Sequence, residues 1–137
     1  MFKIKNEKLK KGIAVITLIA VIVIVLFSRV ESNVTVDEQV IRIPSLWVPN
    51  VPIDDIETVT LIEMSMAEIG PGTRRFGSNV PGALRGHFSS GVLYVAPSSA
   101  PTIQIIRADG NSNVYISYTN PAETRLLFEE IHQYWAN

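Results

Sequence analysis

The chain contains no cysteine and only two histidines among its 137 residues. Without cysteine it can form neither a disulfide framework nor a thiolate metal site, so the fold must be stabilised by packing alone. His87 and His132 have no acidic or nucleophilic partner at a spacing typical of a catalytic site. The sequence also lacks a GxxxxGK(S/T) motif, which excludes nucleotide binding by a P-loop. We therefore expect no enzyme activity, no cofactor and no metal site.

Lysine is absent after residue 11, and this uneven distribution predicts a membrane topology. All five lysines precede an uncharged run over residues 12–28, whose apolar part is Ile13–Phe27. As a helix this run is about 26 Å long, near the lower limit for crossing a bilayer. Because cationic flanks stay in the cytoplasm, residues 1–11 are predicted to form a basic cytoplasmic tail and residues 12–29 a transmembrane signal anchor. The protein would then lie in the cell membrane as a single-pass protein with an extracellular C-terminal domain.

A cleaved signal peptide is the alternative interpretation of the same N-terminal segment, since it also has a basic start and an apolar middle. Cleavage requires small residues just past the apolar core. The chain reads LFSRVESN at this point, with Arg29 and Glu31 where small residues are needed. We therefore favour an uncleaved anchor.

Residues 33–137 are predicted to form one water-facing domain, because about 105 residues suffice for a single hydrophobic core. Beyond residue 29 the chain carries six arginines against twelve acidic residues, a formal charge of −6. Such a charge disfavours binding of nucleic acid, and binding of an anionic membrane by the domain as a whole.

Short runs of β-branched and aromatic residues predict that this domain is mainly β. The predicted strands are residues 34–36, 40–43, 56–64, 91–96, 102–107 and 114–118. Residues 108–113, which contain the pair Asp109-Gly110, predict a hairpin between the last two strands. Three prolines between residues 44 and 52 predict that this segment is an edge strand or an extended connection.

The periodicity of the sequence changes after residue 119. Asn120-Pro121-Ala122-Glu123 supplies a helix N-cap, a proline at the first helical position and a glutamate at the third. Apolar residues then recur at three- and four-residue spacing, at Leu127, Ile131, Tyr134 and Trp135. We predict a C-terminal amphipathic helix whose apolar side packs on the sheets.

Three segments in this order resemble the bacterial pleckstrin-homology-like (PH-like) domains: IDDIETV, then RRFG with GALRGHF, then the hairpin followed by NPAETRLLFEEI. These domains are often fused to membrane helices. The resemblance implies a PH-like barrel of two packed antiparallel sheets capped by a C-terminal α-helix, here preceded by one N-terminal transmembrane helix. It implies no reaction. The phosphoinositide-binding loop of eukaryotic members is not matched, because the early strands of this chain carry Asp37 and Glu38.

Residues 70–91 form a predicted loop that holds six of the eight glycines and is the candidate ligand or partner site. Glycine lets backbone amides approach an anion, and arginine matches the geometry of phosphate or carboxylate. The candidate site residues are Arg74, Arg75, Arg85 and His87. The alternative interpretation is structural: the apolar side chains of the loop pack into the barrel, and its arginines pair with acidic groups of the domain.

We therefore expect a membrane-anchored PH-like module that binds or scaffolds a protein partner at the membrane surface. The leading hypothesis rests on the exposed groove that barrels of this type present beside the helix. The alternative is a binder of an anionic lipid or cell-envelope ligand that acts through the Gly/Arg-rich loop 70–91.

Overall fold

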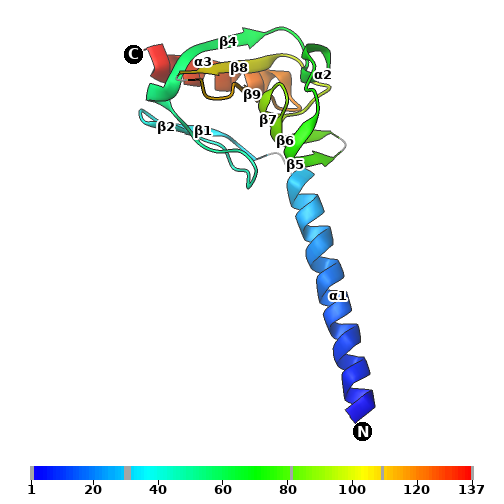
Figure 1. Ribbon diagram of the computed structural model, residues 1–137. Helices are drawn as coiled ribbons and strands as arrows, with labels where there is room; N and C mark the ends of the chain where they lie inside the picture. Colours follow the sequence, from blue (N-terminus) through cyan, green and yellow to red (C-terminus); the bar gives the residue numbers. More distant parts are fainter. Residues whose placement is uncertain (1, 30–31, 81, 109, 137) are drawn as a thin grey trace. The chain divides into compact units, whose positions relative to one another are not determined.

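The computed structural model describes residues 2–29, 32–80, 82–108 and 110–136, and for residues 2–7, 25–29 and 79–80 it describes the backbone only. The chain divides into two compact units, Met1–Val30 and Glu31–Asn137. The first unit consists of the helix α1 (Phe2–Arg29). The described part of the second unit holds the sheets, two α-helices and the short 3-10 helix η1 (Ile53–Asp55) (Figure 1).

The prediction of a transmembrane helix over residues 12–29 is wrong. Among the residues whose side chains the structure describes, no helix combines the length and the hydrophobicity needed to cross a membrane. These side chains of α1 run from Lys8 to Ile24, and three lysines precede the uncharged part, which begins at Gly12. The cell-membrane location stays a prediction.

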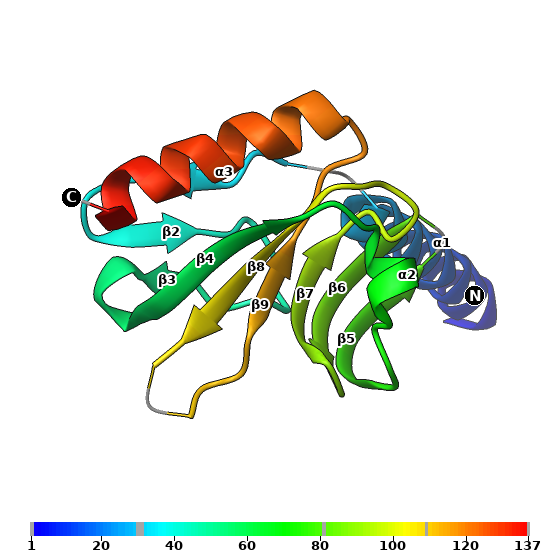
Figure 2. The ribbon, with the colours of Figure 1, turned by 90° about the horizontal axis from the view of Figure 1, so that it is seen from above.

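The second unit contains two sheets (Figure 2). The smaller, antiparallel sheet has three short strands in the order β1 (Thr35–Val36), β2 (Val40–Arg42) and β3 (Val51–Pro52). Pro52 thus lies in an edge strand, as the three prolines predict. The larger sheet has the order β4-β8-β9-β7-β6-β5, with bounds β4 (Ile56–Ile62), β5 (Arg74–Val80), β6 (Ala83–Phe88), β7 (Gly91–Val95), β8 (Thr102–Arg107) and β9 (Val114–Ile116).

The larger sheet is mixed, so the prediction of two antiparallel sheets is wrong. β7 and β9 pair in parallel, with Val92 opposite Val114 and Tyr94 opposite Ile116. The chain reverses direction twice between these strands, and β9 then pairs with both β7 and β8, so it runs the same way as β7. A sheet-rich fold with a C-terminal helix is compatible with a PH-like barrel.

Two hydrophobic clusters pack on opposite faces of the strands at the middle of this sheet. Val92 and Tyr94 of β7 belong to the larger cluster, which also includes the β1–β3 sheet and the C-terminal helix. Leu93 and Val95 belong to the smaller cluster, which includes Met66 of the short helix α2 (Met66–Ile69). Successive side chains of a strand point to opposite faces, so burial of all five residues of β7 follows from cover on both faces.

The C-terminal helix α3 (Pro121–Ala136) begins where the sequence predicts it. The Asn120 Oδ1 atom accepts a hydrogen bond from the Ala122 N–H at 3.0 Å, which satisfies one of the free donors at the helix start. Leu127 and Ile131 are buried. Trp135 packs at the edge of the core and donates from Nε1 to the Ile56 carbonyl at 3.3 Å. The predicted amphipathic helix is therefore confirmed.

The hairpin predicted before this helix is confirmed by the antiparallel pairing of β8 with β9. At its tip, Gly110 has a φ of +73°, a backbone conformation that glycine adopts readily. Asp109, which the prediction paired with Gly110, lies outside the described residues.

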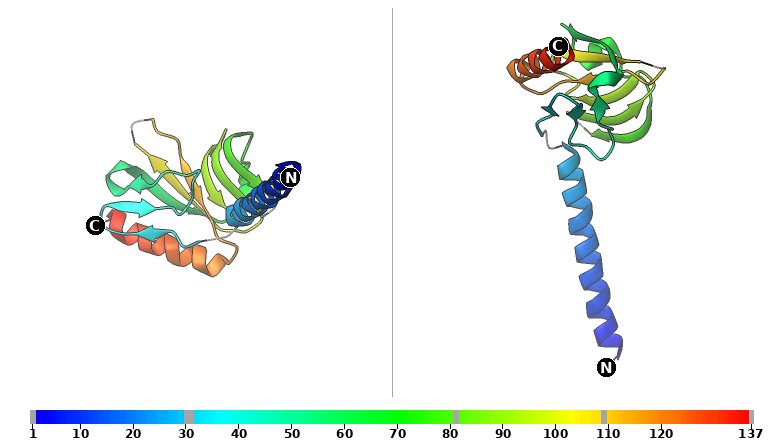
Figure 3. Two further views of the ribbon diagram at one scale, coloured as in Figure 1. Left: turned by 90° about the horizontal axis from the view of Figure 1, so that it is seen from below. Right: turned by 90° about the vertical axis from the view of Figure 1, so that its left-hand side faces the viewer.

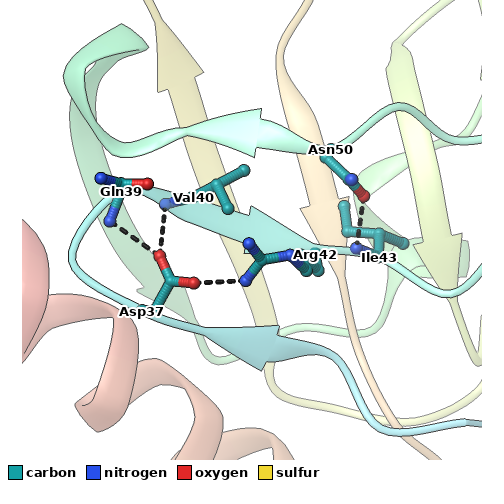
Figure 4. Close-up of polar contacts among 6 residues, drawn as sticks. All are labelled: Asp37, Gln39, Val40, Arg42, Ile43 and Asn50. Carbon is teal, nitrogen blue, oxygen red and sulfur yellow. Dashed lines mark hydrogen bonds and ion pairs between the residues drawn. The ribbon is translucent and has the colours of Figure 1, made fainter.

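Side chains fix both ends of the β1–β2–β3 sheet (Figure 4). In the β1–β2 turn, Asp37 accepts a hydrogen bond from Arg42 and one from the backbone N–H of Val40 at 3.0 Å. These hydrogen bonds, that from Arg42 foremost, lower the pKa of Asp37, so its stabilising effect is lost as the pH falls through this lowered pKa. Beyond β2, the Asn50 Oδ1 atom accepts from the Ile43 N–H at 3.0 Å and so closes the segment 44–49.

Candidate functional site

The predicted loop 70–91 is mostly a β-hairpin, so that prediction is wrong. β5 and β6 pair antiparallel, and Gly77 lies directly opposite Gly86. Both glycines have positive φ, and a Cβ atom on Gly77 would lie 2.2 Å from the Arg85 carbonyl oxygen. These glycines therefore allow the two strands to approach closely. Loops are also rich in glycine, so composition alone does not distinguish a loop from such a pair of strands.

Arg74 and Arg75 are exposed on β5, which is the edge strand of the larger sheet. Among the described residues, ion pairs join Arg42 to Asp37, Arg107 to Asp55 and Arg125 to Glu63, and neither Arg74 nor Arg75 takes part in one. Two of the three candidate arginines thus do not pair with described acidic groups of the domain, whereas Leu84 and Phe88 of the same region are buried, as the structural interpretation expects.

Arg85 lies in the interior, with only 2% of its surface exposed. Its Nη1 atom donates to the Val95 carbonyl at 2.7 Å, and its guanidinium carbon is 4.0 Å from the centre of the Tyr94 ring. The Tyr94 hydroxyl in turn accepts from the Ser32 N–H at 3.1 Å and donates to the Ser32 carbonyl at 3.0 Å. Arg85 therefore connects β6 to Tyr94 and Val95 of β7 inside the core. It does not lie at the surface with Arg74 and Arg75.

His87 is half-buried on β6 and belongs to a group of three rings. Its ring centre is 6.0 Å from that of Phe76, which makes an edge-to-face contact with Trp47 at 5.3 Å. We call Trp47, Phe76 and His87 the aromatic cluster. Trp47 lies in the β2–β3 connection, far from β5 in the sequence, so no local sequence pattern predicts its contact with Phe76.

A groove of about 530 Å³ lies between β1 and the first half of α3. Figure 3 shows α3 alongside the first strands of this unit. The residues that line the groove are Asn33, Val34, Thr35, Val36, Tyr118, Glu123, Leu126, Leu127 and Glu130. The family resemblance predicts a groove beside the helix, but none of these lining residues is a predicted site residue. Leu126 is a large apolar residue of the groove that is not buried: 65% of its surface is exposed, whereas the neighbouring Leu127 is buried.

Acidic and histidine side chains are dispersed rather than gathered into a metal site. No group of three or more such side chains able to hold a metal ion occurs within the described part of the chain. His132 on α3 is exposed and contacts the rings of Phe128 and Trp135, at centre distances of 5.8 and 5.7 Å. The expectation that the protein is not an enzyme stays a prediction.

The chain matches no protein-family model, and comparisons with curated proteins and with solved structures find no match either. The resemblance to bacterial PH-like domains therefore stays a prediction that rests on the quoted segments.

Proposed function

We propose that the second unit is a protein-binding module that takes an extended segment of a partner into the groove between β1 and α3. The observation that carries this proposal is the groove itself, with its volume of about 530 Å³. β1 is an edge strand of the smaller sheet, where it pairs with β2. Edge strands accept an added strand through their main-chain hydrogen-bonding groups, a common mode of peptide recognition.

The lining of the groove defines the chemistry of the partner segment. Val34, Val36 and Leu127 supply apolar surface at its base, and Leu126 adds an exposed apolar side chain. The exposed carboxylates of Glu123 and Glu130 stand on the same helix. A segment with an apolar residue next to lysine or arginine complements this arrangement, because apolar contact supplies affinity and opposite charge supplies orientation.

Selection of peptides from a random displayed library tests this function. The full chain, held in non-ionic detergent because α1 exposes apolar side chains, serves as bait. Peptides that combine apolar and basic residues are expected to be enriched and to bind the Leu126→Asp variant at least tenfold more weakly, a loss of about 1.4 kcal/mol. Leu46→Asp is the matched control, since Leu46 is also an exposed leucine, at 80% against 65% for Leu126, but lies outside the groove. Enriched peptides that bind both variants alike would contradict the groove as the site.

We further propose that the module works at a membrane surface. Ten large apolar side chains between Leu9 and Ile24 are each at least 49% exposed on α1. A helix that exposes apolar side chains to this extent needs apolar surroundings, which lipid provides. Cell fractionation is the measurement: the chain is expected in the membrane fraction, and recovery of most of it in the soluble fraction after lysis would contradict the location.

The alternative function, binding of an anionic lipid or envelope ligand through residues 70–91, involves a different surface. Arg85 is buried, so this surface retains only Arg74 and Arg75 among the candidate arginines. The surroundings of these two residues carry the inference that follows.

A further inference from the structure

Leu46 and Phe76 are protruding apolar side chains of the second unit. Leu46 is 80% exposed and Phe76 is 57% exposed. Trp47 follows Leu46 in the chain and makes the edge-to-face contact with Phe76 at 5.3 Å. The aromatic cluster therefore supplies an apolar surface that combines the β2–β3 connection with the β5–β6 hairpin, and Leu46 is next to Trp47 in the chain.

The exposed positive charge of this unit is concentrated beside that apolar surface. Arg74 and Arg75 directly precede Phe76 and are exposed, and they form no ion pair with any described residue. The other arginines are occupied: three are paired with carboxylates, and Arg85 is buried. In a domain whose formal charge is −6, this is a local cationic site. We call Leu46, Trp47, Phe76, His87, Arg74 and Arg75 the docking patch.

Both segments that carry the docking patch are held in place. The hydrogen bond from the Ile43 N–H to Asn50 closes the connection that presents Leu46 and Trp47, and Trp47 donates its own backbone N–H to the Ser45 Oγ atom at 3.2 Å. β5 is the edge strand of the larger sheet, so Arg74 and Arg75 lie at the edge of the sheet. A register irregularity in the β5–β6 pairing lies between Arg74 and Phe76. The patch is thus presented by fixed backbone, which lowers the entropic cost of binding.

We propose that the docking patch binds an anionic lipid surface, with Leu46, Trp47 and Phe76 at the headgroup boundary and Arg74 and Arg75 on lipid phosphates. Aromatic residues and leucine partition to this boundary, and arginine keeps its charge among phosphates while its stem lies on apolar groups. Leu46 and Phe76 protrude, which suits insertion into a soft surface. The net negative charge of the domain repels an anionic membrane, so the electrostatic attraction to lipid is restricted to the docking patch. Salt weakens this attraction.

The experiment needs a local readout, because the apolar side chains of α1 will attach the full chain to any vesicle. The chain contains two tryptophans, so Trp135→Phe leaves Trp47 as the single fluorophore. Vesicles are made of phosphatidylcholine alone or mixed with phosphatidylglycerol, with bromine on the acyl chains, which quenches tryptophan at close range. Trp47 is expected to be quenched several-fold more in the anionic vesicles, and high salt is expected to remove the difference.

Two controls make the result decisive. Trp47→Phe leaves Trp135 as the fluorophore at the edge of the core, and its quenching is expected to be the same in both compositions. Adding Arg74→Gln and Arg75→Gln to the Trp135→Phe chain is expected to return Trp47 quenching to the neutral-vesicle level, with an unchanged circular dichroism spectrum as the check on folding. The proposal is overturned if Trp47 shows no dependence on lipid charge, as for a patch that binds protein instead, or if the dependence survives loss of both arginines. Either result leaves the peptide selection at the β1–α3 groove unaffected.

Discussion

Gly86→Ala is expected to destabilise the second unit by about 2–4 kcal/mol. Gly86 lies opposite Gly77 with a φ of +128°, and a Cβ atom there would lie 2.3 Å from the Phe76 carbonyl oxygen and 2.7 Å from the Gly77 Cα. Both contacts are with backbone, so they are relieved only if β5 and β6 separate. Urea unfolding of the full chain in detergent, followed by tryptophan fluorescence, measures the change.

Gly82→Ala in the same hairpin is the matched control for backbone conformation. Gly82 also has a positive φ, of +82°, but a Cβ atom there would meet no atom of the described residues within 4 Å. Its expected cost is that of the left-handed conformation alone, about 1–2 kcal/mol. Equal losses for the two variants would show that steric crowding between the strands contributes nothing, and the close approach of β5 and β6 would then be wrong.

This glycine pair explains why residues 70–91 are mispredicted as a loop. Glycine is the usual residue of turns, and also the residue that lets two backbones approach closely, so its frequency does not distinguish the two uses. The pairing partner distinguishes them, and Gly77 and Gly86 become partners only when the hairpin forms. The parallel pairing of β7 with β9 is likewise a property of the whole sheet, because it depends on β9 forming between β7 and β8.

Local signals, by contrast, predict local structure well. Asn120 and Pro121 mark the start of α3, and its buried residues follow the predicted spacing. The short helix α2 also begins with a local signal, the capping box Ser65-Met66-Ala67-Glu68, although this helix is not among the predicted elements. In the structure, the Ser65 Oγ atom accepts from the Glu68 N–H at 3.3 Å, and Glu68 accepts from the Ser65 N–H at 3.2 Å.

The candidate site is predictable only in part, for a reason that lies in its arginines. Arg74, Arg75 and Arg85 look alike in the sequence, and arginine is rarely buried, so all three are expected at the surface. The fate of Arg85 depends on the Val95 carbonyl and the Tyr94 ring, both supplied by the neighbouring strand β7. The docking patch depends in the same way on Trp47, which reaches Phe76 from the connection between two strands of the smaller sheet. The sequence thus indicates that this region contains several arginines, and the tertiary contacts determine which of these arginines lie at the surface.

Ile131→Ala is expected to destabilise the second unit by about 2–5 kcal/mol, because Ile131 is fully buried where α3 packs on the core shared by both sheets. The loss combines the transfer of apolar atoms with the cavity that remains. Leu126→Ala is the matched control on the same helix: Leu126 is 65% exposed, so its loss is expected to stay within about 0.5 kcal/mol. Urea unfolding of both variants compares the two faces of α3. Similar losses for both would contradict the packing of α3, and with it the assignment of Leu126 to an open groove rather than to the core.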